Sequence, residues 1–398
     1  MSASKRKPVA AIVSDTHCLP NAWVGRPGLR GDAFHAFETA VSVAIKRGLP
    51  LIACGDVIDV PNPASAVARF LRRQARRAKS AGLGFYFILG NHELTDPPWL
   101  AAISDVPVSL HKRSVEINGL KFYGLDYTPF DRLQQELAAV PEGTDVFICH
   151  QAWEEFMGKM CRTDGSLALI HNARFVITGD YHTYETKQIA TVQGKSIRVL
   201  SPGSLVQTEI TEVDPRCMHI LYDDLTTEPI ELKGRPQLAP PKLETEQHLE
   251  AFLENVDNQI AQAIADAEDL PEQLQKPIIR VEYRTTIPDV FRRLTKAIGD
   301  KAHFFRKEDR PATPEQDTDR KKKRNAVQAG LVGCLSEVVP DEKSDLYRLT
   351  RALLEEVQRG EKPEVVLQRL KTDFLQGAES GSSSTKQQLR KAAVPGVQ

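Results

Sequence analysis

Short runs of apolar residues recur between residue 9 and about residue 210, and each run ends in glycine or a polar residue. Stretches with the apolar spacing of helices separate the runs. This alternation predicts an α/β domain. Two segments carry hairpin signals instead, residues 114–124 with a turn at Asn118-Gly119 and residues 189–200 with a turn at Gly194. They predict an antiparallel portion of sheet.

The pattern changes after residue 210. Residues 216–222 predict a strand that pairs with a further strand beyond Asp223-Asp224, and the proline-rich residues 236–241 predict a domain boundary. The first domain is therefore expected over residues 1–236.

A small α+β unit is expected over residues 243–306. Its pattern predicts a helix at 243–268, a strand at 278–283, a helix at 288–298 with proline near its first turn, and a strand at 302–306. The expected order is helix, strand, helix, strand.

Three segments complete the predicted organisation. Residues 307–343 are charged and contain proline and the basic run Arg320–Arg324, so we expect a linker. Residues 344–375 predict two short amphipathic helices, and the Gly/Ser-rich residues 376–398 predict a disordered tail. Such short helices are marginal alone, which favours docking on a partner over packing on their own domain.

Each of five apolar runs is followed at once by residues that can bind a metal ion. These residues are Asp15 and His17, Asp56, Asn91 with His92, His150, and Asp180 with His182. The carboxyl ends of parallel strands meet at one edge of a sheet, so the five segments should converge on one crevice. Mixed oxygen and nitrogen donors without thiolate favour manganese, iron or zinc at a site that keeps a position open.

The order of these motifs resembles the signature of calcineurin-like metallophosphoesterases. The matching motifs are Asp15-x-His17, Gly55-Asp56-x-x-Asp59, Gly90-Asn91-His92-Glu93, the lone His150, and Gly179-x-x-His182. The resemblance covers about residues 9–210 and implies an α/β/β/α sandwich, here followed by a small α+β cap and a helix-loop-helix. Independent turns at strand ends would not supply this order.

The resemblance also implies roles for individual residues. Asp15, His17, Asp56 and His182 resemble the ligands of one divalent cation, and Asp56, Asn91, His150 and Asp180 those of the second, so that Asp56 bridges the two. Such a pair activates water and clamps the attacking and leaving oxygens. His92 resembles the general acid, and we expect Asp59 to orient it.

One position departs from the family pattern. The family has Gly-His-x-His in its last motif, whereas this chain has Gly179-Asp180-Tyr181-His182. An aspartate ligand adds negative charge, which lowers the Lewis acidity of its ion and favours harder metals such as manganese or magnesium. We therefore expect two Mn²⁺ ions and regard the second ion's site as altered.

Within the family, the chain resembles the nuclease subunit of SbcCD-type DNA repair and recombination complexes, including phage versions. The resemblance rests on residues 201–204 (Ser-Pro-Gly-Ser) followed by Glu209, on the strand around residues 228–235, on the α+β unit and on the terminal helix pair. It implies a DNA exonuclease or endonuclease whose helix pair binds an SbcC-type ATPase subunit. It leaves a homodimer open.

Two other functions stay open at this point. A cyclic-nucleotide or other small-molecule phosphodiesterase would explain the first domain but leave residues 243–375 without a role. A non-catalytic DNA-binding or scaffold subunit would fit the altered Asp180 position. A Ser/Thr phosphatase fits less well, because Val60-Pro61 follows Asp59 where that group has Arg-Gly.

Composition changes this picture little. The chain has 398 residues, 41% hydrophobic content and a formal net charge of −1, so DNA must be met by local patches. Candidate contacts are Trp23, Arg26 and Arg30, for stacking and phosphate binding, although an ordered surface loop is the plainer interpretation. An arginine-rich helix face around residues 69–77 is a candidate too, or an ordinary solvated face.

The remaining features concern the compartment. The six cysteines are scattered without a CxxC pair, which indicates reduced thiols. The basic N-terminal residues lead directly into a strand-like run, so we expect no secretion signal and no membrane span. A cytoplasmic location follows, in the host cytoplasm if the chain is phage-encoded.

Overall fold

The computed structural model describes residues 6–20, 28–158, 163–207, 212, 214–309 and 350–351. Residues 1–309 form one compact unit and residues 310–398 a second. The predicted linker, helix pair and tail therefore lie almost wholly outside the described residues, and only the first unit supports a structural account.

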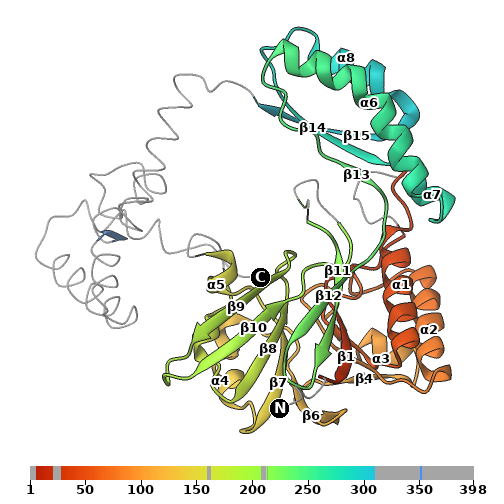
Figure 1. Cartoon of the computed structure of the whole chain (residues 1–398). Coiled ribbons are helices and arrows are strands. Elements are labelled where there is room, and N and C mark those ends of the chain that lie inside the picture. Colours follow the sequence, from red (N-terminus) through yellow and green to blue (C-terminus); the bar gives the residue numbers. More distant parts are fainter. Residues whose placement is uncertain are drawn as a thin grey trace, which may run out of the picture. The chain divides into compact units, whose positions relative to one another are not determined.

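The first sheet of this unit has the strand order β12-β11-β1-β2-β3-β4. Its strands are β1 (Pro8–Val13), β2 (Leu51–Cys54), β3 (Phe85–Ile88), β4 (Pro107–Ser109), β11 (Cys217–Tyr222) and β12 (Thr227–Glu231). Strands β1 to β4 run parallel, whereas β11 and β12 pair in antiparallel fashion. On the outer face pack the helices α1 (Asp32–Arg47), α2 (Ser65–Ser80) and α3 (Trp99–Ile103) (Figure 1).

The second sheet has the order β5-β6-β7-β8-β10-β9. Its strands are β5 (Ser114–Ile117), β6 (Leu120–Gly124), β7 (Thr144–His150), β8 (Ala173–Gly179), β9 (Glu185–Ala190) and β10 (Ser196–Ser201). The predicted hairpins are β5–β6 and β9–β10, and both are antiparallel. Against the outer face lie α4 (Phe130–Ala138), α5 (Glu154–Met157) and the 3₁₀ turn Leu167–Leu169.

A buried apolar layer joins the two sheets. Ile12 and Ile52 of the first sheet and Ile148 and Ile177 of the second belong to this layer, while Val13 belongs to the cluster beneath the helices of the first sheet. Strands buried on both faces require continuous apolar runs, which is why the sequence pattern identified them. The predicted α/β/β/α sandwich is confirmed.

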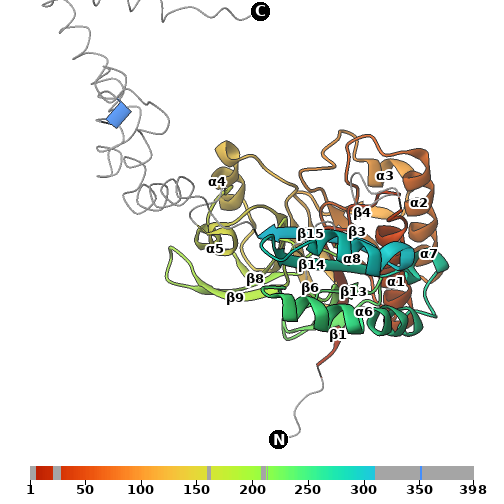
Figure 2. The same ribbon diagram turned by 90° about the horizontal axis from the view of Figure 1, so that it is seen from above.

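A smaller unit, which we call the cap, covers residues 237–309. It comprises β13 (Gln237–Leu238), α6 (Glu246–Asp266), α7 (Glu272–Gln275), β14 (Ile278–Arg284), α8 (Val290–Ile298), a 3₁₀ turn (Gly299–Lys301) and β15 (His303–Asp309). The three strands are parallel in the order β13-β14-β15. Helices α6 and α8 pack together on one face of the sheet (Figure 2).

Two details of the cap differ from the sequence prediction. The proline-rich residues 236–241 contain strand β13, which is paired with β14. Helix α8 begins at Val290 after Asp289, which has a positive φ of 49°. Pro288 therefore precedes the N-cap instead of occupying the first helical turn.

The cap is joined to the sandwich by buried contacts. Ile278 and Phe305 belong to the apolar cluster beneath α1 and α2. Just before the cap, Arg235 donates to both carboxylate oxygens of Asp32 at 2.8 and 3.0 Å and to the carbonyl of Lys276 at 3.0 Å. The start of the cap is thus fixed to α1 by a buried, bidentate ion pair.

Among the described residues, no helix is long and apolar enough to cross a membrane. Cys18, Cys54, Cys149 and Cys217 are free thiols, and Cys161 and Cys334 lie outside the described part of the chain.

Candidate metal centre

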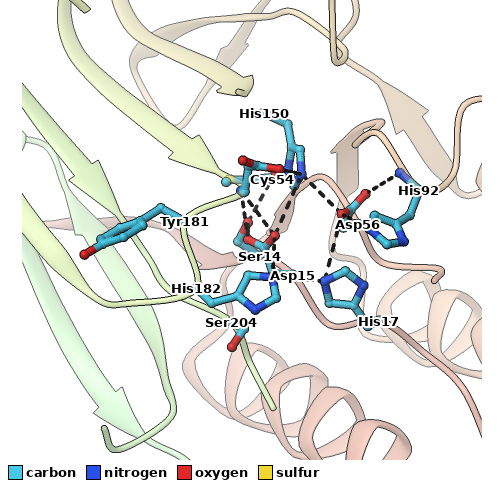
Figure 3. Close-up of polar contacts among 12 residues, drawn as sticks. Ser14, Asp15, His17, Cys54, Asp56, His92, His150, Tyr181, His182 and Ser204 are labelled. Carbon is cyan, nitrogen blue, oxygen red and sulfur yellow. Dashed lines mark hydrogen bonds and ion pairs between the residues drawn. The ribbon is translucent and has the colours of Figure 1, made fainter. Parts of the chain in front are cut away.

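The five predicted strand ends meet at one edge of the sandwich. Strands β1, β2 and β3 bring their carboxyl ends from the first sheet, and β7 and β8 bring theirs from the second. Four of the residues here have left-handed backbones, with φ of 48° at Asp15, 46° at His17, 49° at Asp56 and 77° at Asp180. Such conformations are costly for non-glycine residues and gather at functional sites. Figure 3 shows the side chains of this edge turned toward one another.

Glycines at these strand ends allow the close approach. A Cβ atom on Gly90 would overlap the carboxylate of Asp56, and one on Gly179 would overlap the imidazole of His150. The glycines before the predicted ligands are therefore required by contact between neighbouring strand ends, not only by turn conformation.

Asp56 lies at the middle of the cluster. One oxygen, Oδ1, accepts the main-chain N–H of His92 at 3.1 Å. The other, Oδ2, is 3.3 Å from His150 Nε2, 3.9 Å from His17 Nε2 and 4.0 Å from His92 Nε2. An oxygen with imidazole nitrogens on several sides is placed as a bridging ligand would be.

Asp15 occupies the other side of His150. Its Oδ1 is 3.8 Å from His150 Nε2 and 3.7 Å from His182 Nε2. Its carboxylate also accepts the Ser14 hydroxyl at 2.5 Å and the main-chain N–H of Asp180. Since His182 Nε2 lies 3.3 Å from His17 Nε2, these residues form a second group that can share an ion.

Three imidazoles are oriented in the same way, by an oxygen atom at hydrogen-bond distance from Nδ1. His150 Nδ1 is 2.8 Å from the Cys54 carbonyl oxygen, His17 Nδ1 is 2.8 Å from Asp59 Oδ1, and His182 Nδ1 is 2.7 Å from Glu212 Oε1. An acceptor at Nδ1 fixes the proton there and leaves the Nε2 lone pair available for a metal. All three Nε2 atoms face the cluster.

His150 provides the test of whether a metal fits. Its side chain is fully buried, and Nε2 has no hydrogen-bond partner although it faces the carboxylates of Asp15 and Asp56. A buried polar atom without a partner is costly and calls for an explanation. Two carboxylates and an oriented imidazole around one point are a donor set for a divalent cation, and the residues fit one.

The charges of the cluster shift several pKa values. Burial alone would raise the pKa of Asp56, but the imidazoles of His150, His17 and His92 lower it to about 2. Burial alone would lower the pKa of His150, but the carboxylates of Asp56 and Asp15 raise it well above its ordinary value. The metal-free cluster therefore holds protons that a cation must displace.

Asp180 is placed at the outer side of the cluster. Its Oδ1 is 3.9 Å from His150 Nε2, and its side chain is 22% exposed. Burial and the nearby charges of Asp15 and Asp56 raise its pKa, although His150 opposes this. Asn91 follows β3 in the loop whose His92 contacts Asp56, and it is exposed. The structure thus brings both residues to the same edge as the other predicted ligands.

Asp59 contacts two imidazoles, His92 as expected and His17 as well. Its carboxylate is 2.8 Å from His17 Nδ1 and 3.6 Å from His92 Nδ1. The closer contact of His92 is with the Asp59 main-chain carbonyl, 3.1 Å from Nδ1. The backbone of Asp59 thus orients His92, whereas its carboxylate supports His17. His92 itself is 44% exposed at the side chain.

Of the three expected DNA contacts, only Arg30 is among the described residues. Trp23 and Arg26 lie outside the described residues, and Arg30 is exposed beyond the N-terminus of α1. On α2, Leu71 and Ala75 are buried while the arginines face outward. These arginines line an open hollow of about 770 Å³ and are Arg69, Arg72, Arg73, Arg76 and Arg77.

Sequence reasoning missed Glu212 and Arg216. Glu212 accepts from His182, and Arg216 donates to the His182 carbonyl at 2.8 Å and to Ser204 Oγ at 2.7 Å. Neither residue follows an apolar run that ends at the site. A signal existed only in their closeness to the Ser-Pro-Gly-Ser segment that ends at Ser204.

A comparison with models of protein families finds a match that includes this edge of the sandwich. The family model described as calcineurin-like phosphoesterase matches residues 9–184. That stretch contains all the side chains of the cluster, from Asp15 to His182.

Similar proteins include two archaeal ones. The DNA double-strand break repair protein Mre11 of Haloferax volcanii is 26% identical over 230 residues, which are 56% of this chain and 50% of that protein. The protein of the same name from Methanosarcina mazei is 28% identical over 224 residues, which are 52% of this chain and 34% of that protein. This chain thus spans about half the length of the first relative and a third of the second.

A solved structure described as a novel archaeal phosphodiesterase is 17% identical, with a TM-score of 0.33. The match covers 56% of this chain and 99% of that structure.

Proposed function

Because residues 9–184 belong to the calcineurin-like metallophosphoesterases, we propose that this chain is a dinuclear-metal phosphodiesterase that cleaves DNA as the nuclease subunit of an SbcCD-type complex. The observation that carries the metal-dependent part is the buried Nε2 of His150, which makes no hydrogen bond and faces two carboxylates. The DNA-directed part is supported by the similarity to the two archaeal repair proteins.

The residues divide into two ligand sets. Asp15, His17, Asp56 and His182 would hold one ion, and Asp56, Asn91, His150 and Asp180 the other. Asp56 Oδ2 has imidazole nitrogens of both sets within 4 Å, which suits a shared ligand. The carboxylate-rich donor set favours Mn²⁺.

When bound, two divalent cations supply Lewis acidity and lower the pKa of an attacking water. The chain's own contribution is to fix the donors before substrate arrives. Carbonyl and carboxylate acceptors hold the imidazole Nδ1–H groups, and the left-handed backbones at Asp15 and Asp56 aim the carboxylates inward. Such preorganisation avoids reorientation during the reaction.

We propose that His92 protonates the leaving oxygen. With Nδ1 donating to the Asp59 carbonyl, Nε2 can hold a proton and points to the open side of the cluster, 4.0 Å from Asp56 Oδ2. A protonated Nε2 would donate to the leaving 3′ or 5′ oxygen of a phosphodiester. Asp59 is then a positioning residue for His92 through its backbone and for His17 through its carboxylate.

The openness of the edge favours a polymer over a small substrate. Sites for small molecules enclose most of the ligand surface, whereas His92 is 44% exposed and His182 30% exposed. Trp23, Arg26 and Arg30 remain our proposed DNA contacts, for base stacking and phosphate binding.

The proposed partner is an SbcC-type ATPase, bound by the helix pair at residues 344–375, and a homodimer is compatible with the proposal. Removal of residues 340–398 should abolish capture of the ATPase subunit and leave the metal-dependent activity of the first unit. Capture that survives the deletion would contradict this assignment.

The decisive experiment compares substrates. With Mn²⁺, the wild type should degrade linear duplex or single-stranded DNA and leave cyclic nucleotides intact, and EDTA should stop the reaction. His92→Ala should lower kcat by about 10²–10⁴-fold, the range for loss of a general acid, with Mn²⁺ affinity unchanged. Hydrolysis of cyclic nucleotide alone would favour the small-molecule phosphodiesterase, and binding of DNA without any hydrolysis would favour the non-catalytic subunit.

A further inference from the structure

The support of His182 extends beyond the sandwich into the cap. Glu212 accepts from His182 Nδ1 through Oε1, 2.7 Å away, and its Oε2 lies 3.4 Å from Arg216 Nη2. The other guanidinium nitrogen of Arg216, Nη1, donates to the His182 carbonyl at 2.8 Å. Glu212 and Arg216 thus hold both the ring and the backbone of His182.

Arg280 of the cap strand β14 holds the same glutamate by its main chain. Its Nη1 donates to the Glu212 carbonyl oxygen at 2.8 Å. Arg280 is only 7% exposed, and a buried guanidinium requires acceptors around it. Glu212, which orients His182, is therefore held by Arg280 of the cap as well as by Arg216.

The alternation along β14 explains why Arg280 points to the sandwich. Ile279, Val281 and Tyr283 belong to the apolar core shared with α6 and α8, so the residues between them lie on the opposite face of the sheet. On that face, Ile278 is part of the apolar cluster of the sandwich. The anchor at Ile278 is two residues from Arg280, so β14 cannot move at this point without moving the guanidinium.

We infer that Arg280 is a positioning residue through which the cap controls the metal centre. It fixes the main chain of Glu212, Glu212 fixes the His182 imidazole, and His182 completes one ligand set. A displacement of β14, for example by nucleic acid bound to the cap, would loosen that set without contact between the ligand and the metal. The inference rests on the metal centre of the proposed function.

The test measures metal binding instead of DNA cleavage. Arg280→Met removes the donor to Glu212 and keeps an apolar stem, and Arg280→Lys keeps one charged donor. Arg284→Met is the matched control, because Arg284 lies on the same face of β14, is half exposed and pairs with Glu244 and Asp309. Mn²⁺ affinities are determined by calorimetric titration well below the unfolding temperature of each variant.

We expect Arg280→Met to weaken one of the two Mn²⁺ sites about tenfold, at the low end of the effects seen for outer-sphere residues. Arg280→Lys should recover most of the affinity, and Arg284→Met should match the wild type. In a Glu212→Ala background, Arg280→Met should cause no further loss, because the two residues act in series.

Wild-type affinity in Arg280→Met, or an additive loss in the double variant, would overturn the inference. If Arg280→Met does not fold, the Arg280→Lys variant is compared with the Arg280→Lys/Glu212→Ala double variant. Equal Mn²⁺ affinities of these two proteins would also overturn the inference. A wild type that binds no Mn²⁺ would instead contradict the proposed function itself.

Discussion

The metal centre has a floor and a rim that are built differently. The floor is Asp15, Asp56 and His150, which are all buried and lie at a strand end or two residues after one. Gly90 packs against Asp56, and Gly55 and Gly179 pack against His150. The rim is His92, Asp180 and His182, which are partly exposed and held by side chains or carbonyls from distant segments. The floor is thus determined by the sheets, whereas the rim depends on contacts that can be changed one at a time.

The largest expected effect comes from the floor. Asp56→Ala removes the shared oxygen and leaves His150 buried beside one carboxylate fewer. We expect Mn²⁺ affinity to fall more than about 100-fold at both sites, beyond the range of outer-sphere changes, and activity to be lost. Metal content after desalting and DNA cleavage measure this.

The matched control for that variant is Asp105→Ala, since Asp105 is 81% exposed and its carboxylate contacts Lys79 and the Ser104 hydroxyl, away from the cluster. Retention of two tightly bound ions by Asp56→Ala would show that the floor is not the common element of the two sites.

A smaller effect is expected at the rim. Asp180→Ala should lose or weaken one ion only and keep the other, because Asp180 contacts the cluster from one side. Asp180→His restores the family residue and should shift the preference of that site from Mn²⁺ toward softer cations such as Zn²⁺, since imidazole binds softer cations well and the change removes a negative charge. Ion stoichiometry distinguishes the variants. Two ions bound with unchanged affinity in Asp180→Ala would remove Asp180 from the ligand set.

A substitution at Asp59 tests its contact with His17 separately from its contact with His92. Asp59→Asn keeps the main-chain carbonyl that holds His92 but replaces the carboxylate on His17. We expect Mn²⁺ affinity to fall about tenfold, with the pH profile of kcat unchanged. A shifted profile at constant Mn²⁺ affinity would instead assign the carboxylate to His92.

The mildest perturbation is a change of pH, which should give a graded change in Mn²⁺ affinity. The carboxylates raise the pKa values of His150 and His182 in the metal-free cluster, so the metal-free form binds more protons than the loaded form. Affinity for Mn²⁺ should therefore rise with pH, by up to about tenfold per pH unit for each proton displaced. Titrations in buffers of different ionisation enthalpy count the protons, and an affinity that does not change with pH would contradict the described charge distribution.

The difference between floor and rim also explains which residues of the site could be predicted from the sequence. The floor could be predicted because each of its residues lies within two positions of the end of a buried apolar run, so that the carboxyl ends of the strands bring Asp15, Asp56 and His150 together. The same apolar runs predicted the sandwich, and the turns at Asn118-Gly119 and Gly194 predicted the two hairpins.

The contacts that hold the rim residues could not be predicted from the apolar runs. Glu212 lies 30 residues beyond His182, and no periodic pattern indicates that its carboxylate returns to the imidazole. Asp59 was expected to orient His92, but spacing could not indicate that its main-chain carbonyl makes the shorter contact with His92 or that its carboxylate also reaches His17. Arg280 alternates with apolar residues and therefore looks like a solvent-facing position, although it is buried.

The anchoring of the cap limits how this protein can be rearranged by recombination. Ile278 and Phe305 belong to the core of the sandwich, and Arg235 fixes the approach to β13 on α1. A cap exchanged with that of another chain would leave two holes in the sandwich core. The cap therefore depends on the sandwich, and its sequence should vary mainly in its loops and its outer helices.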